Sequence, residues 1–247
     1  MFVGEDGCRM SFGTIEGMSD SENKALKSWY WYDWANQAFA LTIGTVLGGQ
    51  LITRYFNLAT GGSSEIAGFN VTGTSFYAAV LGLSMVFVAI SSPILGAIAD
   101  RIRIKKKIVW TYTIIGVIFT AFMGIAPHLN EDSAYRLLAF CFLMGQIGMA
   151  GGNTIYYAFM PYLADQDQME KVSSWGFAYG FAGGTVILIV HLIVMATGGL
   201  GLTSAYGPWT LSFAFVTTSL WWLGFGLPFF RNTPEPEIAK ERTYSSV

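Results

Sequence analysis

Residues 80–107 read VLGLSMVFVAISSPILGAIADRIRIKKK, an apolar run that ends in five cations. Its apolar part belongs to a stretch, 66–99, that contains no Asp, Glu, Lys or Arg over 34 residues. A helix needs about 20 apolar residues to cross a bilayer, and a charged side chain at the bilayer centre costs about 2.5–3.5 kcal/mol. We therefore expect a membrane-spanning helix here, with the basic residues just outside the lipid.

Four further stretches also lack charged side chains: 34–53, 108–130, 137–164 and 172–230. The last of them, 59 residues long, is too long for one helix and long enough for two, with a glycine-rich break at 198–201. The runs are continuously apolar and do not alternate, which favours helices over barrel strands. The sequence thus predicts an all-α membrane protein with six transmembrane helices, near residues 33–57, 73–99, 107–127, 134–162, 173–197 and 207–230.

The composition agrees with a membrane protein. Hydrophobic residues make up 53% of the 247 positions and charged residues 12%, whereas soluble domains carry about 25% charged residues. The net charge of −2 leaves no basic footprint for a nucleic-acid partner. Cys8 and Cys141 have no neighbouring His or Cys with which to build a metal site, so neither a metal nor a cofactor is expected.

Positive charge sets the expected orientation, because cytoplasmic loops carry an excess of Lys and Arg. With six spans, both tails share one side with the second and fourth loops. Twelve of the fourteen cations fall on that side: Arg9, Lys24, Lys27, Arg101, Arg103, Lys105, Lys106, Lys107, Lys171, Arg231, Lys240 and Arg242. Arg54 and Arg136 fall on the other. We therefore expect a multi-pass integral protein with both termini cytoplasmic, divided into a tail (1–28), a six-helix bundle (29–230) and a second tail or start of a central linker (231–247).

Glycines recur at spacings of three and four in the fourth and fifth predicted helices. Such a stripe lets two helix backbones approach closely. Static packing explains the pattern, and a smooth face along which helices slide during a transport cycle is the functional alternative. The expected packing positions are Gly145, Gly148, Gly151 and Gly152 in one helix and Gly176, Gly180, Gly183 and Gly184 in the other.

Polar residues also occur deep in the fourth predicted helix. Gln146 and Asn153 are seven residues apart and so share one helical face, which Tyr156 and Tyr157 extend. An amide in hydrocarbon needs partners, so this face should meet protein or a water-filled cavity. Hydrogen bonding between helices and contact with a substrate in a cavity both remain open.

Two titratable residues lie in or beside the predicted spans. Asp33 starts the first predicted helix within the aromatic segment Trp31-Tyr32-Asp33-Trp34. A helix N-terminus favours Asp, so the residue is either a helix-terminal and interfacial group or a gating carboxylate at the cytoplasmic mouth. His191 stands alone in the fifth predicted helix, and we expect a buried or interfacial histidine rather than a proton relay.

The loop after the second predicted helix combines a Gly-x-x-x-Asp-Arg head with the basic run. These residues resemble the loop signature of the major facilitator superfamily, in which Gly, Asp and Arg brace the second helix against a neighbouring bundle. The resemblance implies a conformational role for Gly96, Asp100, Arg101 and Lys105. Arg103 stands where the signature usually has a second Gly.

Three further segments resemble one branch of this superfamily, the autophagy-related vacuolar amino-acid effluxers and their bacterial and archaeal relatives. They are YDWANQAF at 32–39, YYAFMP at 156–161 and SWGFAYGFAGG at 174–184. Tyr157 stands where the branch commonly has Asn. The resemblance implies a twelve-helix carrier in two six-helix halves, with a small solute such as an amino acid held at the midplane, and it adds Asn36 to the expected cavity.

The resemblance covers only the N-terminal half of such a carrier. A split transporter, a homodimer and a truncated or non-transporting membrane scaffold are all compatible with that length. Exposing a polar cavity wall to lipid is costly, so a functional protein should have a second six-helix half as partner, besides its solute and membrane lipid.

An enzyme is not expected. The sequence has no Gly-x-Ser-Gly of a rhomboid-like protease, no His-Glu-x-x-His of a zinc protease and no phosphate-binding Gly-x-x-x-x-Gly-Lys-Ser. His128 and His191 are far apart and have no adjacent carboxylate. These observations leave no candidate set of catalytic groups.

Overall fold

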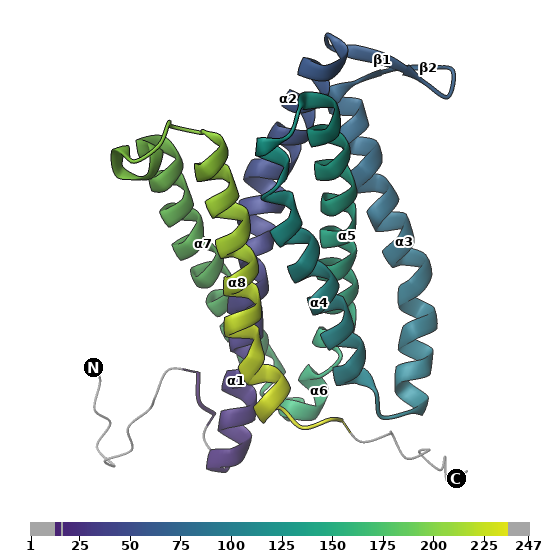
Figure 1. The fold of residues 1–247 in the computed structure, drawn as a ribbon. Helices are drawn as coiled ribbons and strands as arrows, with labels where there is room; N and C mark the ends of the chain where they lie inside the picture. The colour runs from purple at the N-terminus through teal and green to yellow at the C-terminus, as the bar shows by residue number, and fades with distance from the viewer. Residues whose placement is uncertain (1–12, 16, 237–247) are drawn as a thin grey trace.

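The computed structural model describes residues 13–15 and 17–236. The ends of both expected tails lie outside the described residues, and with them Cys8, Arg9, Lys240 and Arg242. Within the described residues the chain is almost entirely helical (Figure 1), as the charge-free stretches predict.

Five long helices dominate the described part of the chain. They are α3 (Gly73–Arg101), α4 (Lys105–Met123), α5 (Glu131–Tyr157), α7 (Met169–Gly201) and α8 (Pro208–Asn232). A short 3-10 turn, η2 (Ala126–His128), follows α4, and one turn of helix, α6 (Met160–Leu163), follows α5. All five long helices are long and apolar enough to cross a membrane. They correspond to the second to sixth predicted spans.

The first predicted span, 33–57, falls on a helical segment built from three parts. These are α1 (Asp20–Ala38), the π-helical η1 (Phe39–Leu47) and α2 (Gly48–Thr60). We call α1, η1 and α2 together the first segment. It is not among the helices that satisfy both length and apolar character. The structure thus establishes five such helices within its described residues, one fewer than the six expected.

The first segment begins earlier than its charge-free stretch. Ser19 caps α1 through a capping box in which its hydroxyl accepts from the Glu22 backbone N–H at 3.3 Å and the Glu22 carboxylate accepts from the Ser19 N–H at 2.8 Å. Leu26 and Trp29 are fully buried. The last residues of the expected tail, 20–28, therefore form helix that packs into the bundle.

The π-helical η1 lies in the middle of the first segment. Its backbone bonds reach back five residues, as in the bond that the Gly48 N–H donates to the Ile43 carbonyl. The Thr45 side-chain hydroxyl also donates to the Ala40 carbonyl, at 3.0 Å. Such segments are rare and are often found at functional sites. A π-helical turn is wider than an α-helical turn. Side chains on the two sides of η1 therefore do not point in the relative directions that a continuous α-helix would give them.

A short β-hairpin interrupts the otherwise helical chain between α2 and α3, and the chain as a whole stays consistent with the all-α prediction. β1 (Ser63–Ile66) pairs antiparallel with β2 (Phe69–Thr72) between α2 and α3. Ala67 and Gly68 form a two-residue turn with φ values of 52° and 82°. Positive φ at both turn residues matches the twist of paired strands, which is why so short a loop closes the hairpin.

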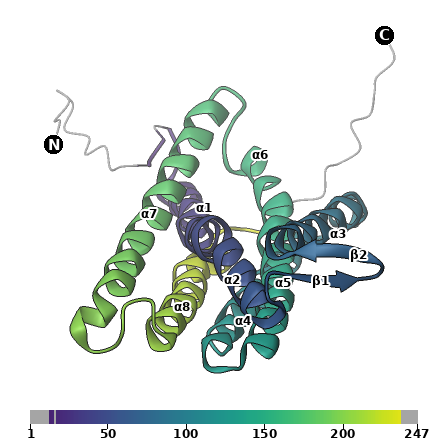
Figure 2. The ribbon, with the colours of Figure 1, turned by 90° about the horizontal axis from the view of Figure 1, so that it is seen from above.

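The helices form a bundle in which the first segment and α5 lie centrally (Figures 1 and 2). The first segment packs against α5, α7 and α8, while α5 also packs against α3 and α4. Viewed along the bundle, α7 and α3 stand at opposite sides, with the first segment and α5 between them (Figure 2). We call the surface that runs from α7 over the first segment and α5 to α3 the open face.

The core has two apolar clusters along the bundle. One contains Phe39, Phe142 and Trp222 in the half near the hairpin. The other contains Trp29, Tyr156 and Phe229 in the half near α6. The aromatic residues that the sequence places at the start of the first segment thus form part of the core and do not only lie at a lipid interface.

The glycine-rich break in the longest apolar stretch is confirmed. α7 ends at Gly201 and α8 begins at Pro208. Gly198, Gly199 and Gly201 have φ values of 60°, 62° and 88°, a region that side chains disfavour. The glycines therefore let the chain leave α7 and turn back into α8.

Candidate functional site

A hydrogen-bonded pair of amides, one buried and one half-buried, joins the first segment to α5. The Asn36 Nδ2 donates to Asn153 Oδ1 at 2.6 Å. Asn36 is fully buried, and its Oδ1 has no hydrogen-bond partner among the described residues. The pair thus combines a satisfied contact between helices with one open acceptor.

Gln146 lies on the same side of α5 as Asn153, two turns away. A Cβ on Gly44 of η1 would lie 4.0 Å from Gln146 Nε2, so this amide also faces the first segment. A Cβ on Gly145 would lie 2.8 Å from the ring of Phe39. The first segment therefore packs against the amide-bearing side of α5 near Gly145 and Gln146 as well as at Asn153.

Tyr156 belongs to the core. Its hydroxyl donates to the Trp29 carbonyl at 2.6 Å, the Trp29 Nε1 donates back to the Tyr156 carbonyl at 3.3 Å, and the two rings stack at 4.8 Å. Tyr156 is fully buried in this arrangement. It fixes α1 to α5, whereas its neighbour Tyr157 points elsewhere.

Tyr157 lines a cavity of about 200 Å³ together with Asp33. We call it the inner cavity; its lining is Trp29, Asp33, Tyr157, Met160, Ser173, Gly176 and Phe177. These residues come from α1, the end of α5, α6 and the start of α7. Asp33 is only 1% exposed, and its Oδ1 has no hydrogen-bond partner among the described residues. The structure thus brings together Asp33 and Tyr157, which the sequence assigned to separate roles.

The glycines of α7 face α1. A Cβ on Gly176 would come within 2.9 Å of the Trp29 ring, and one on Gly180 within 3.1 Å of the Asp33 carboxyl carbon. Gly184 stands against the Gln37 backbone in the same way, at 2.7 Å, and Gly183 against Trp34. These positions leave no room for a larger side chain without moving one helix.

The glycines of α5 face α4 and the first segment. A Cβ on Gly148 would lie 2.6 Å from the Gly116 Cα and 2.7 Å from the Tyr112 carbonyl oxygen. Gly151 stands against the Tyr112 ring, and a Cβ on Gly152 would lie 3.4 Å from Tyr112 Cβ. Backbone therefore meets backbone where α4 and α5 cross.

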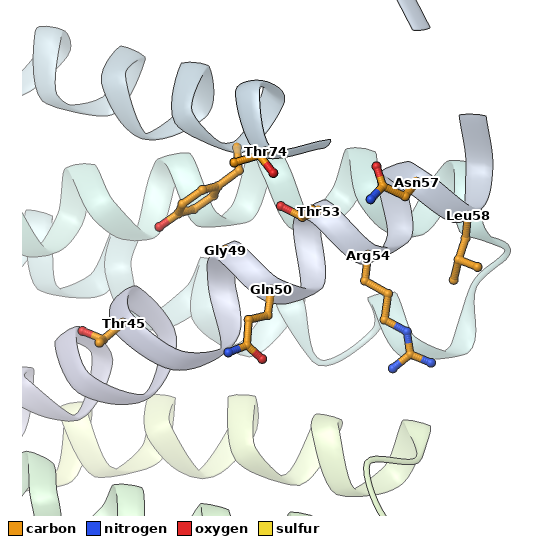
Figure 3. A pocket seen from close by; sticks show the side chains of 9 residues that line it. Thr45, Gly49, Gln50, Thr53, Arg54, Asn57, Leu58 and Thr74 are labelled. Atoms are coloured by element: carbon orange, nitrogen blue, oxygen red, sulfur yellow. The ribbon is translucent and has the colours of Figure 1, made fainter. Parts of the chain in front are cut away.

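A larger pocket of about 770 Å³ lies at the other end of the first segment (Figure 3). We call it the outer pocket; it is lined by Thr45, Gly49, Gln50, Thr53, Arg54, Asn57, Leu58, Thr74 and Tyr77. Gln50 and Arg54 extend from the same side of α2 (Figure 3). Arg54 is exposed and takes part in neither of the two ion pairs found in the described part of the chain.

Sequence reasoning used Arg54 only to set the orientation. The sequence does contain a pattern that indicates the outer pocket. Small and polar residues recur every four positions and so follow one side of a helix: Thr45, Gly49, Thr53 and Asn57. The π-helical turn within this pattern and the approach of α3 could not be read from the sequence.

The basic loop after α3 contains an ion pair. Lys105 Nζ lies 2.8 Å from Asp100 Oδ1, and it also donates to the Tyr162 hydroxyl at 3.4 Å, over a ring whose centroid is 4.9 Å away. The Lys105 side chain is 7% exposed and that of Asp100 is 70% exposed. Arg101 is exposed, and a Cβ on Gly96 would meet no described atom within 4 Å. Asp100 and Lys105 thus come together, while Gly96 and Arg101 stand apart from them.

The same loop holds the chain that follows α8, a contact that sequence reasoning missed. The Lys106 N–H donates to the Glu235 carboxylate at 3.0 Å, and Lys106 Nζ donates to the Thr233 carbonyl at 2.7 Å. Glu235 therefore caps the N-terminus of α4, where backbone N–H groups lack helical partners. Asn232 and Thr233 are bonded in turn to Ser28 and Ala25 of α1.

His191 is buried with both ring nitrogens engaged. Nδ1 lies 3.2 Å from the Thr42 hydroxyl and Nε2 lies 2.8 Å from the Thr217 hydroxyl. The residue ties α7 to η1 and α8, as expected for a core histidine. Groups of three or more potential metal ligands are absent from the described residues.

Comparison with known proteins relates the chain to one family and to one bacterial transporter. The family described as "Vacuole effluxer Atg22 like" matches residues 21–245. The chain is also 26% identical over 221 residues to a protein of Bacillus subtilis (strain 168) named "Uncharacterized MFS-type transporter YxiO". That match covers 90% of this chain and 49% of the relative, so the chain spans about half the relative's length.

The family match extends over almost the whole chain and agrees with the four segments singled out in the sequence. The five apolar helices and this membership together identify a multi-pass membrane protein. The chain belongs to the family of vacuole effluxer Atg22-like proteins.

Proposed function

We propose that the chain forms one six-helix half of a carrier of the major facilitator type, which moves a small solute by alternating access. The family membership and the name of the Bacillus relative support transport. The coverage of only half of that relative supports the assignment to one half. The first segment supplies the sixth span, and both termini are cytoplasmic.

The observation that carries the proposal is the series of polar groups along the first segment. They are Asp33 in the inner cavity, the pair Asn36–Asn153, and Arg54 in the outer pocket. Polar and ionisable groups within a membrane are costly and therefore mark solute and ion pathways. In an inert scaffold, apolar side chains at these positions would be more stable.

The second half covers the open face. α3 exposes Leu83, Phe87, Ile90 and Ile94 there or at the lipid boundary, and the outer pocket opens beside it. Arg54 forms no ion pair within residues 17–236, and a pocket that holds its charge is unfavourable against hydrocarbon, so we expect a second six-helix half to enclose it.

Amino acids are the proposed solute class. The family description names an effluxer, and the vacuolar branch that the motifs resemble exports amino acids. A pathway with one carboxylate, Asp33, and one guanidinium, Arg54, suits a solute that carries both charges. Asn36, Gln146 and Asn153 supply neutral hydrogen-bonding groups between these two ends.

Counterflow in proteoliposomes tests the proposal. The tagged chain is purified from its native membrane with whatever stays bound, and labelled amino acids are offered to vesicles preloaded with the unlabelled mixture. We expect saturable accumulation that falls in the variant Asn153→Leu and persists in Phe140→Leu, an exposed position on the same helix. Vesicles that accumulate nothing beyond protein-free liposomes would contradict the proposal.

A further inference from the structure

Asp33 is a buried carboxylate without a counter-charge. It is 1% exposed, and the ion pairs within the described residues join Asp100 to Lys105 and Asp132 to Arg136. Its Oδ1 accepts no hydrogen bond from any described residue. Removing a charge from water without pairing it is unfavourable, so a cationic group or a proton has to satisfy this oxygen.

The inner cavity gives such a cation room and aromatic surroundings. Its volume of about 200 Å³ exceeds what one water needs. Trp29, Tyr157 and Phe177 line it, and its lining contains no Lys, Arg or His. Aromatic faces attract cations through their quadrupoles. Trp29 is buried, whereas Tyr157 and Phe177 are exposed at the cavity's rim. A carboxylate beside three aromatic side chains therefore favours an organic cation.

The same lining argues against a metal ion. Ca²⁺ takes six to eight oxygen ligands and Mg²⁺ near-ideal octahedral geometry. Asp33 supplies the only carboxylate of the lining, with Ser173 and Tyr157 adding one hydroxyl each. An anionic group is disfavoured by Asp33 itself.

The glycines of α7 bring this helix close to the Asp33 carboxylate. Gly176 lines the cavity, and a Cβ there would lie 3.9 Å from Asp33 Oδ2. A Cβ on Gly180 would lie 3.1 Å from the Asp33 carboxyl carbon, so α7 packs closely on α1 at this level. The cavity therefore reaches Asp33 beside Gly176, which is the one of these two glycines that lines it.

We propose that the inner cavity binds the ammonium group of a small organic solute, with Asp33 as its counter-charge and Trp29, Tyr157 and Phe177 as its aromatic walls. The binding site rests on this geometry, while its use in solute movement rests on the proposed function. Asp33 thereby defines a substrate class: amines and amino acids, not simple carboxylates or sugars.

Equilibrium binding to the detergent-purified protein tests the site without transport. Labelled choline and labelled ethanolamine are the probes, and 3,3-dimethyl-1-butanol is the uncharged isostere of choline. We expect saturable binding of at least one probe, competition by the unlabelled ammonium and no competition by the alcohol. Asp33→Asn should weaken binding about tenfold or more, since it leaves the ammonium without its counter-charge. Asp165→Asn, the same change at an exposed carboxylate, should leave it unaltered.

Three outcomes would overturn the site: neither probe binds, the alcohol competes as well as the ammonium, or Asp33→Asn binds like the parent. Competition by NaCl at the concentration of the probe would do so too, because it indicates a site for small cations. If Asp33→Asn does not fold, the comparison of ammonium and alcohol on the parent protein still decides. Binding without counterflow would contradict the proposed function and leave the site intact.

Discussion

The side chain of Asn36 donates a hydrogen bond of 2.6 Å to that of Asn153, although the two residues lie 117 positions apart in the chain. The contact fixes the first segment against α5 at the centre of the bundle. The Oδ1 of Asn36 has no hydrogen-bond partner among the described residues, so this buried amide keeps one unsatisfied acceptor.

A double-mutant cycle measures this contact. Asn36→Leu and Asn153→Leu each leave one amide unpaired, and each should lower the free energy of unfolding by roughly 0.6–2 kcal/mol. The double variant should lose less than the sum, because no orphaned partner remains. Thermal unfolding in detergent supplies the values. Losses that simply add would show that the hydrogen bond contributes nothing to stability.

Gly148→Ala should destabilise the crossing of α4 and α5. The new Cβ would lie 2.6 Å from Gly116 Cα, so two backbones have to separate, at a cost of about 1–3 kcal/mol. Gly82→Ala is the matched control, since a Cβ there meets no described atom within 4 Å. Replacing a helical glycine in open space should stabilise by up to about 1 kcal/mol. Equal melting temperatures for the two variants would contradict the close approach.

Asp100→Asn should affect conformational cycling more than stability. Asp100 is 70% exposed, and exposed ion pairs contribute about 1 kcal/mol or less. Lys105 is nearly buried and would lose its counter-charge, with only neutral acceptors such as the Tyr162 hydroxyl left to it. We expect normal insertion and slowed counterflow, with Lys107→Gln, an exposed cation of the same loop, as control. Counterflow at the parental rate would show that Asp100 has no conformational role in transport.

Glu235→Gln should release the chain that follows α8. The variant loses the negative charge at the N-terminus of α4, an interaction of about 0.3–1 kcal/mol. Limited proteolysis should then cut after α8 faster than in the parent. Glu65→Gln, on the exposed hairpin, should leave that rate unchanged. If cleavage after α8 keeps its parental rate, the carboxylate does not hold this segment.

The sequence was sufficient for the features that depend on composition over many residues. The charge-free stretches locate five long helices, and the glycines at 198–201 mark the turn between α7 and α8. Gln146 and Asn153 fall on one side of α5 because seven residues make two helical turns. These arguments need no knowledge of neighbouring helices.

Features that depend on tertiary contacts could not be predicted. Tyr156 and Tyr157 are adjacent, yet one stacks on Trp29 in the core and the other lines the inner cavity. The cap that Glu235 provides to α4 joins residues 129 positions apart. The π-helical η1 changes the directions in which side chains of the first segment point, and the composition of the sequence does not predict a π-helix there.

The central claim is that the first segment crosses the bilayer and so completes a six-span half. Side-specific labelling tests it, with a membrane-impermeant maleimide applied to intact cells that carry Ser21→Cys or Ser64→Cys in place of the native cysteines. Ser21 lies at the start of α1 and Ser64 in the hairpin, so one crossing should separate them. We predict that the Ser64→Cys variant is labelled from outside and that Ser21→Cys is labelled only after the membrane is opened. Labelling of both from outside would show that the first segment does not span the membrane, and would contradict the account.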